Sequence, residues 1–525
     1  MKELLKLIVL FVLLGGMNSC KKDIGNYEYG SIDSLFINGL ADTYTIKSGQ
    51  TVELKPDVEF LSRKKFIPEE YEFEWLSYRV LNNPQPEVHL GKTQFYEGEF
   101  PLGIGKYRMF YRVREKKTNI TWTKQFELNV AAAYNGGWMI LTEEDNKSRL
   151  DFFEWDQIEK SYSRVHRNFQ DLVKDPATGD VIPLKGKPKW LGGWNNAPNG
   201  ISNSPLFFVY VGTEEGTEKI NMDDGAIWNE RYSFRWETSN PPAFETIDKL
   251  VPSAASDGYV VNGDDVFLRL RVMSVQFGVP INRLADGLYF RASSHMAVYQ
   301  SFIPSSLMYD KDHRRFVINN NFNSISSSPL AYDSNSAFNP NDLGMDLVWM
   351  NQTIAFGGRA YAILTKDNRY YLARMDHNTT FAARYWDEIT DCPDIAKASF
   401  FEVDPRYGYL QYVVEGKIYQ YDTDEKKTKV MKDYGSRKIS VFQYSRSSNI
   451  TDYYVTQFPE TYGKRFVPLL RGLICATYDP SAPAASGKVE VFDVPQFSAP
   501  FQTFLTFDGF GKVIGAVEAE KPYGW

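Results

Sequence analysis

The chain is short of cysteine, histidine and positive charge. Its 525 residues include three cysteines, too few for a disulfide framework, so the fold must depend on a hydrophobic core. The five histidines show none of the paired spacings of zinc sites, and no serine-nucleophile elbow or phosphate-binding glycine loop occurs. A net charge of −7 argues against nucleic acid as a main partner. We therefore expect no catalytic residues, no metal site and no other cofactor.

Long apolar segments are lacking as well. One apolar run, residues 7–14, follows two lysines and is far shorter than the about 20 residues of a membrane-spanning helix. It precedes small residues and a cysteine, which is the pattern of a signal peptide over residues 1–19. Cys20 stands where bacterial lipoproteins carry their acylated cysteine, so we expect a lipidated Cys20 and a stalk over residues 20–34. The alternative is a secreted or non-secreted chain with a chance cysteine.

Aromatic residues, by contrast, make up 15% of the chain, which favours β structure. Residues 71–75 alternate aromatic and acidic side chains, as in a strand with one buried face. Similar short strands recur at regular spacing, over residues 34–37, 51–56, 106–113 and 122–130. They predict an immunoglobulin-like β-sandwich over residues 35–132, with Trp75 as its buried tryptophan and Tyr107 as a tyrosine corner.

This N-terminal region resembles the polycystic-kidney-disease-like (PKD-like) family of Bacteroidetes outer-membrane lipoproteins. The resemblance rests on the Cys20-Lys-Lys-Asp start, the Gly25-Asn-Tyr-Glu-Tyr segment, and the Tyr-x-Phe-x-Trp and Gly-x-Tyr-x-x-x-Tyr strands. The Gly-Asp-Gly turn that follows the tryptophan in ordinary PKD domains is absent, because Leu-Ser-Tyr follows Trp75. The resemblance implies a lipid anchor in the outer membrane, display towards the cell exterior, and a spacer role for the sandwich. It also implies an accessory role beside a SusC/SusD-type nutrient importer.

From residue 137 onward a hairpin template recurs: an apolar strand, a polar turn, and an aromatic strand that ends in aspartate. Its clearest copies begin with strands over residues 137–141, 361–364, 408–413 and 472–475. The Asp-Asn and Glu-Gly turns between such strands are hairpin signals. Spacings of about 40–60 residues predict a β-propeller-like domain over residues 137–525, with about seven or eight blades. Two further β-sandwiches are the alternative.

Residues 188–196 form the most suggestive loop for ligand binding. Trp190 and Trp194 could stack on sugar rings, while Asn195 and Asn196 could bond to hydroxyl groups. The alternative is that both tryptophans pack beneath neighbouring strands. We expect a non-catalytic surface lipoprotein that captures a glycan or peptide for the importer. An extracellular propeller hydrolase or lyase acting on polysaccharide, and a purely structural subunit of the transporter complex, stay open.

Overall fold

The chain is all-β and divides into two compact units between Ala131 and Ala132. The computed structural model describes residues 33–80, 86–134, 136–156, 158–196, 206–238, 244–252, 258–269, 276–299, 305–320, 326–353, 357–377, 381–445 and 464–520. The side chains of Asn195, Asn196, Lys464 and Leu470 lie outside this description.

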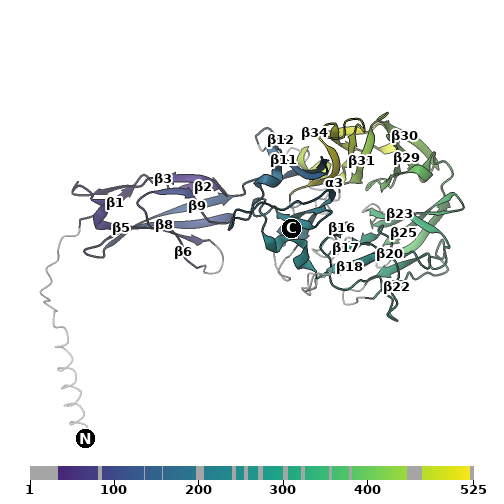
Figure 1. Ribbon diagram of the computed structural model, residues 1–525, viewed down its shortest axis with the longest axis horizontal. Coiled ribbons are helices and arrows are strands. Elements are labelled where there is room, and N and C mark those ends of the chain that lie inside the picture. Colours follow the sequence, from purple (N-terminus) through teal and green to yellow (C-terminus); the bar gives the residue numbers. More distant parts are fainter. Residues whose placement is uncertain are drawn as a thin grey trace, which may run out of the picture. The chain divides into compact units, whose positions relative to one another are not determined.

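The first unit contains one five-stranded sheet and two smaller strand pairs (Figure 1). The sheet has the order β2 (Thr43–Lys47), β9 (Thr121–Ala131), β8 (Gly105–Glu115), β5 (Tyr71–Arg79), β6 (Val88–Gly91). The pairs are β1 (Leu35–Asn38) with β4 (Asp57–Phe60), and β3 (Thr51–Leu54) with β7 (Tyr96–Glu99). Strand β2 runs parallel to β9, and the other pairings are antiparallel.

One hydrophobic core joins this sheet to both strand pairs. Trp75 on β5 is fully buried, and its ring lies 4.4 Å from that of Tyr111 and 5.8 Å from that of Tyr96. Its indole nitrogen donates to the Thr93 carbonyl at 2.8 Å. The hydroxyl of Tyr107 donates to the Gly103 carbonyl at 2.8 Å, the bond expected of a tyrosine corner. The predicted buried tryptophan and tyrosine corner are therefore both present.

Seven antiparallel sheets follow one another along the described residues of the second unit (Figure 1). The first contains β12 (Ser161–His166), β11 (Lys147–Asp156), β10 (Gly137–Glu144) and β35 (Lys512–Glu518); the second, β13 (Pro188–Asn196), β14 (Leu206–Thr213) and β15 (Thr217–Asn221); the third, β16 (Lys249–Pro252), β17 (Gly258–Asn262) and β18 (Asp265–Arg269). The fourth contains β19 (Ala297–Tyr299), β20 (Ser305–Asp310), β21 (Arg315–Asn319) and β22 (Ser328–Pro329); the fifth, β23 (Asp346–Thr353), β24 (Arg359–Lys366), β25 (Arg369–His377) and β26 (Phe381–Glu388). The last two contain β27 (Phe400–Val403), β28 (Leu410–Val414), β29 (Lys417–Asp422) and β30 (Lys427–Asp433), and β31 (Lys438–Tyr444), β32 (Leu473–Tyr478), β33 (Gly487–Asp493) and β34 (Gln502–Phe510).

Helices are few among the described residues. The α-helix is α3 (Lys464–Arg471), and the 3-10 helices are η2 (Pro68–Glu70), η3 (Phe169–Leu172), η4 (Glu230–Tyr232), η5 (Phe234–Glu237), η8 (Ile395–Lys397) and η10 (Gln496–Ser498). In the part of the chain that the structure describes, no helix combines the length and the apolar character that a membrane crossing requires.

The sheets of the second unit form a closed cycle through one strand of each, which we call the inner strands: β35, β13, β16, β19, β23, β27 and β31. Contacts join β35 to β13, β13 to β16, β19 to β23, β23 to β27, β27 to β31, and β31 back to β35. A shared core with Val251 on β16 and Ala297 on β19 joins the remaining pair. Because β35 pairs with β10, the C-terminal strand completes the N-terminal sheet of the unit.

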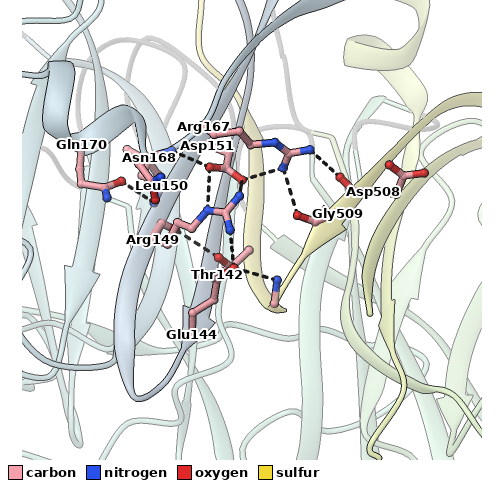
Figure 2. A network of polar contacts seen from close by, with 11 residues as sticks. Thr142, Glu144, Arg149, Leu150, Asp151, Arg167, Asn168, Gln170, Asp508 and Gly509 are labelled. Atoms are coloured by element: carbon pink, nitrogen blue, oxygen red, sulfur yellow. Dashed lines mark hydrogen bonds and ion pairs between the residues drawn. The ribbon is translucent and has the colours of Figure 1, made fainter. Parts of the chain in front are cut away.

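A polar network around the buried Asp151 also connects the first sheet to the last (Figure 2). Asp151 on β11 is fully buried and accepts two hydrogen bonds from Arg149, at 2.9 and 2.7 Å, and one from Arg167, at 2.8 Å. Arg167 also donates to the carbonyls of Asp508 and Gly509 on β34, at 2.8 and 3.3 Å. The closure therefore rests on a paired carboxylate as well as on strand pairing.

The hairpin turns follow from their sequences. The predicted Asp-Asn turns at 145–146 and 367–368 place both residues at positive φ in two-residue loops, as a type I′ turn requires. At four other turns an aspartate accepts backbone N–H groups two and three residues ahead, which fixes the chain reversal. These aspartates are Asp156, Asp310, Asp404 and Asp422.

Candidate functional site

The structure describes two of the five site residues that the sequence predicts. Cys20 lies outside the described residues, and so do the side chains of Asn195 and Asn196. The segment that carries the other two, residues 188–196, is strand β13, which pairs with β14, and not the loop that the sequence suggests. Strand β13 is also an inner strand, in contact with β35 and β16.

Trp194 lies in the core. Its side chain is 2% exposed, and its ring lies 5.9 Å from that of Tyr210 and 6.4 Å from that of Phe277. A Cβ atom on Gly258 would come within 2.6 Å of the indole, so this glycine makes room for the ring. The structure thus gives Trp194 the packing environment that was the alternative to ligand stacking. A direct ligand contact would require its ring to leave the core.

Trp190 is half-buried and lies at the wall of a cavity. Its indole nitrogen donates to the Ile247 carbonyl at 2.8 Å. The ring lies over Gly212, where a Cβ atom would come within 2.0 Å of that nitrogen. Its position is therefore fixed by a hydrogen bond and by a glycine on the neighbouring strand.

The cavity has a volume of about 350 Å³ and is lined mainly by residues of the inner strands β13, β16, β27, β31 and β35. We call it the inner-strand cavity. Its lining combines aromatic side chains, hydroxyl and amide groups, and charged groups, including Trp190, Lys249, Glu402, Gln443, Tyr444 and Glu518. Gly515 permits the close approach of β35 to β13, since a Cβ atom there would lie 2.6 Å from that of Leu191.

Glu518 on β35 is an acidic group of this wall with a shifted pKa. Burial raises the pKa of its carboxyl group, and the negative charge of Glu520 raises it further. A Glu518 oxygen lies 3.2 Å from the hydroxyl oxygen of Ser445, which also lies 2.7 Å from the Leu469 carbonyl. A hydroxyl has one proton, so its two acceptors compete for it and the shorter contact is the stronger. The hydrogen bond to Glu518 is therefore weak, and it lowers the pKa of Glu518 less than burial raises it.

Tyr444 on β31, another residue of the lining, also has a hydroxyl close to two oxygen atoms. Its hydroxyl oxygen lies 2.8 Å from Gln411 Oε1 and 3.2 Å from Asp404 Oδ2. Gln411 in turn donates to Gln420 at 2.9 Å, which fixes Gln411 Oε1 as the acceptor of the tyrosine proton. Burial raises the pKa of Asp404, whereas the N–H groups of Tyr407 and Arg406 and the hydroxyl of Tyr444 lower it by hydrogen bonding.

Two further carboxylates line the cavity. Glu402 on β27 is 8% exposed, and Asn351 approaches both of its oxygens, at 3.3 and 3.4 Å. Asp248 accepts from the Gly263 N–H at 2.8 Å and from Lys189 at 3.1 Å; these bonds, that of Gly263 first, lower its pKa. The lining thus includes three acidic groups and the cation of Lys249.

The sequence analysis missed Glu402, Tyr444 and Glu518, which come from strands of three different sheets and form no motif. One signal was available. Glu402 follows two phenylalanines and precedes a valine, and Glu518 stands between Val517 and Ala519. A charged residue inside an apolar strand indicates either a buried ion pair or a functional site.

Comparison with known proteins identifies a family for part of the chain. The model of the PKD-like family matches residues 20–186, which is less than half of the chain and reaches past the first unit. The resemblance to this family is thus confirmed for that segment. No curated protein sequence matches the chain.

Several solved structures are similar to this chain at low identity. One is a quinonprotein alcohol dehydrogenase-like protein from Bacteroides thetaiotaomicron, with 12% identity and a TM-score of 0.39, covering 93% of this chain and 96% of that one. The extracellular domain of a hybrid two-component system from the same organism has 9% identity and a TM-score of 0.36, covering 88% and 66%. A dihydro-heme d1 dehydrogenase has 11% identity and a TM-score of 0.35, covering 74% and 75%.

Proposed function

We propose that this protein is a non-catalytic surface lipoprotein that captures a glycan or peptide in the inner-strand cavity. In this proposal Cys20 is acylated and anchors the chain in the outer membrane, facing the cell exterior. The first unit is a β-sandwich spacer and the second a seven-bladed β-propeller. The captured ligand passes to a SusC/SusD-type importer. The observation that carries the proposal is a cavity of ligand size within a cycle of inner strands.

The propeller assignment is supported by the order of the sheets. Each sheet except the first is made from consecutive strands. Contacts join six of the seven neighbouring pairs of inner strands, and a shared hydrophobic core includes residues of the seventh pair, β16 and β19. Strand β35 completes the first sheet from the other end of the unit. Propellers need such a closure, because it joins the first and last blades without leaving open edges between them.

Binding is supported by the size and lining of the cavity. The cavity volume of about 350 Å³ lies within the range of about 300–1,000 Å³ that is typical of ligand pockets. Trp190 and Phe400 supply apolar surface, while Gln443 and Ser440 supply polar groups that can fix the orientation of a ligand. This mixture suits a small ring or side chain that carries several polar substituents.

The anchor and the importer rest on the N-terminal sequence and on the match to the PKD-like family. Each buried methylene of an acyl chain contributes about 0.8 kcal/mol to membrane binding, so several chains hold a soluble domain firmly. We expect Cys20→Ala to move the protein from the membrane fraction to the soluble fraction. Cys392→Ala, at a half-buried cysteine of the second unit, is the matched control and should stay in the membrane. Equal membrane retention of both variants would contradict the lipid anchor.

Ligand capture is tested on the purified mature chain with panels of oligosaccharides and short peptides. Binding is measured by calorimetry, and Glu402→Gln is compared with Glu425→Gln, a control at an exposed glutamate in a turn. We expect at least one ligand whose affinity falls in the cavity variant only. Recovery of a SusC/SusD-type pair from outer membranes, with no ligand in either panel, would instead favour a purely structural subunit.

One observation favours the enzyme alternative. The two carboxyl groups Glu402 and Glu518 line the same cavity, and the raised pKa of Glu518 is the property of a general acid in a glycoside hydrolase. Reducing ends released from bacterial, plant or host polysaccharides would reveal such an activity. Hydrolysis by the wild type that disappears in Glu518→Gln would replace the binding proposal with a hydrolase.

A further inference from the structure

We propose that the ligand of the inner-strand cavity is an amino sugar whose protonated amine pairs with Glu518. The inference deepens the proposed function and rests on it, because it names the chemical class that the same cavity selects. Three features of the wall carry it: the balance of its charges, the hydrogen-bond accounting at Glu518, and an unsatisfied hydroxyl opposite an apolar surface.

The charges of the lining select against an anionic ligand. Glu402, Glu518 and Asp248 face the cavity together with a single cation, Lys249. Asp248 already bonds to Lys189, which moderates its charge. The other two carboxyl groups of the lining, Glu402 and Glu518, come from the strands β27 and β35. A cation is therefore the complementary charge.

Hydrogen bonding at Glu518 points to a donor on the ligand. The hydroxyl of Ser445 lies closer to the Leu469 carbonyl, at 2.7 Å, than to Glu518, at 3.2 Å, so an ionised Glu518 receives only a weak hydrogen bond from it. Glu520 adds a repulsive charge. The guanidinium of Arg465 bonds to Glu520 and leaves Glu518 uncompensated by that group. A ligand ammonium group supplies both a positive charge and three N–H donors to this carboxylate.

The rest of the lining favours a hydroxylated ring as the body of the ligand. The hydroxyl oxygen of Ser440 is buried at the cavity and has no hydrogen-bond partner among the described residues. Trp190 and Phe400 border the same space with apolar surface. A pyranose has hydroxyl groups on its rim and C–H groups on its faces, so it satisfies both features at once. An amine on that ring completes the match to Glu518.

The test measures binding of glucosamine, glucose and N-acetylglucosamine to the full mature chain at pH 7 by calorimetry. We expect glucosamine to bind about tenfold or more tightly than glucose, the usual gain from a charge-assisted hydrogen bond. N-acetylation removes the charge and should abolish the gain. In Glu518→Gln the ratio of the two affinities should fall to about one, whereas Glu425→Gln should keep the wild-type ratio.

Loss of folding cannot mimic this result, because the N-acetylglucosamine comparison uses the wild type alone. Equal affinities for glucosamine and glucose in the wild type would overturn the amine inference and leave ligand capture intact. Absence of binding by all three sugars would overturn it as well. In that case the oligosaccharide and peptide panels decide separately whether the cavity captures any ligand.

Discussion

Asp151 offers the sharpest test of how the second unit closes. In Asp151→Asn the side chain keeps its shape, but one carboxylate oxygen becomes an amide NH2 group and the negative charge is lost. Asp151 is fully buried and accepts from Arg149, from Arg167 and, at 2.9 Å, from the Asn168 N–H. The remaining oxygen can still accept from the Arg149 Nε and the Asn168 N–H. The amide then faces the other two guanidinium N–H groups donor to donor.

The magnitude follows from these two lost contacts. Each is a charge-assisted bond, worth about 1.5–3 kcal/mol when a partner is removed. Solvent reduces the penalty, because the side chains of Arg149 and Arg167 are 18% and 35% exposed. Arg149 also keeps its ion pair with Glu144 at 2.5 Å. We therefore expect Asp151→Asn to lower the free energy of unfolding by about 2–4 kcal/mol, less than removal of a fully buried pair would.

The assay is urea unfolding at pH 7, followed by tryptophan fluorescence. The control is Asp145→Asn in the adjacent hairpin turn, where the residue is exposed and asparagine tolerates the positive φ of 49°. This control should change stability by no more than about 0.5 kcal/mol. If Asp151→Asn changes stability as little as the control, the buried carboxylate does not hold the closure, and strand pairing by β35 suffices.

Two further predictions concern the neighbourhood of the cavity. Gly258→Ala should destabilise the protein by about 1–3 kcal/mol, because the added Cβ would overlap the buried ring of Trp194. The control Gly216→Ala should leave stability unchanged, because nothing lies within 4 Å of a Cβ atom at that position. Equal melting temperatures of the two variants would contradict the packing of Trp194 against Gly258. Glu518→Gln should raise the melting temperature at pH 7, because burial and, to a smaller extent, the charge of Glu520 hold the folded pKa of Glu518 above its unfolded value, so its ionisation opposes folding. That advantage should shrink as the pH falls through the folded pKa and then through the unfolded pKa of about 4.3, and it should vanish near pH 3, where the carboxyl is protonated in both states. A gain that persists undiminished at about pH 3 would contradict the assigned cause.

Local hairpins could be predicted from the sequence because their signals lie within a few residues. The Asp-Asn turns at 145–146 and 367–368 and the Glu-Gly turn at 415–416 all separate paired strands. Three of the four predicted aspartate ends are also strand ends: β11, β29 and β33 finish at Asp156, Asp422 and Asp493. Turn chemistry and strand alternation decide these features with little help from distant contacts.

The environment of residues 188–196 could not be predicted in the same way. Two tryptophans and two asparagines around a Gly-Gly pair are typical of an exposed loop. The segment is nevertheless an inner strand, because Gly212 and Gly258 on neighbouring strands leave room for the rings of Trp190 and Trp194. Each tryptophan is far in the sequence from the glycine that it packs against, so the sequence alone does not indicate that the two residues lie together.

The cavity is lined mainly by the inner strands, which come from different sheets. In the sequence, its polar residues therefore stand out only as single charged residues within apolar strands. Inner strands are covered by neighbouring sheets, so apolar residues dominate them, as in Val513 to Val517 on β35. A carboxylate at such a position loses hydration unless it faces enclosed polar space. Glu518 has a raised pKa and a repulsive neighbour in Glu520, so it reduces stability where it stands. A residue that opposes folding at the wall of a cavity is best explained by the ligand that it binds there. We therefore expect substitution of Glu518 to raise the stability of the protein and to lower its affinity for the ligand.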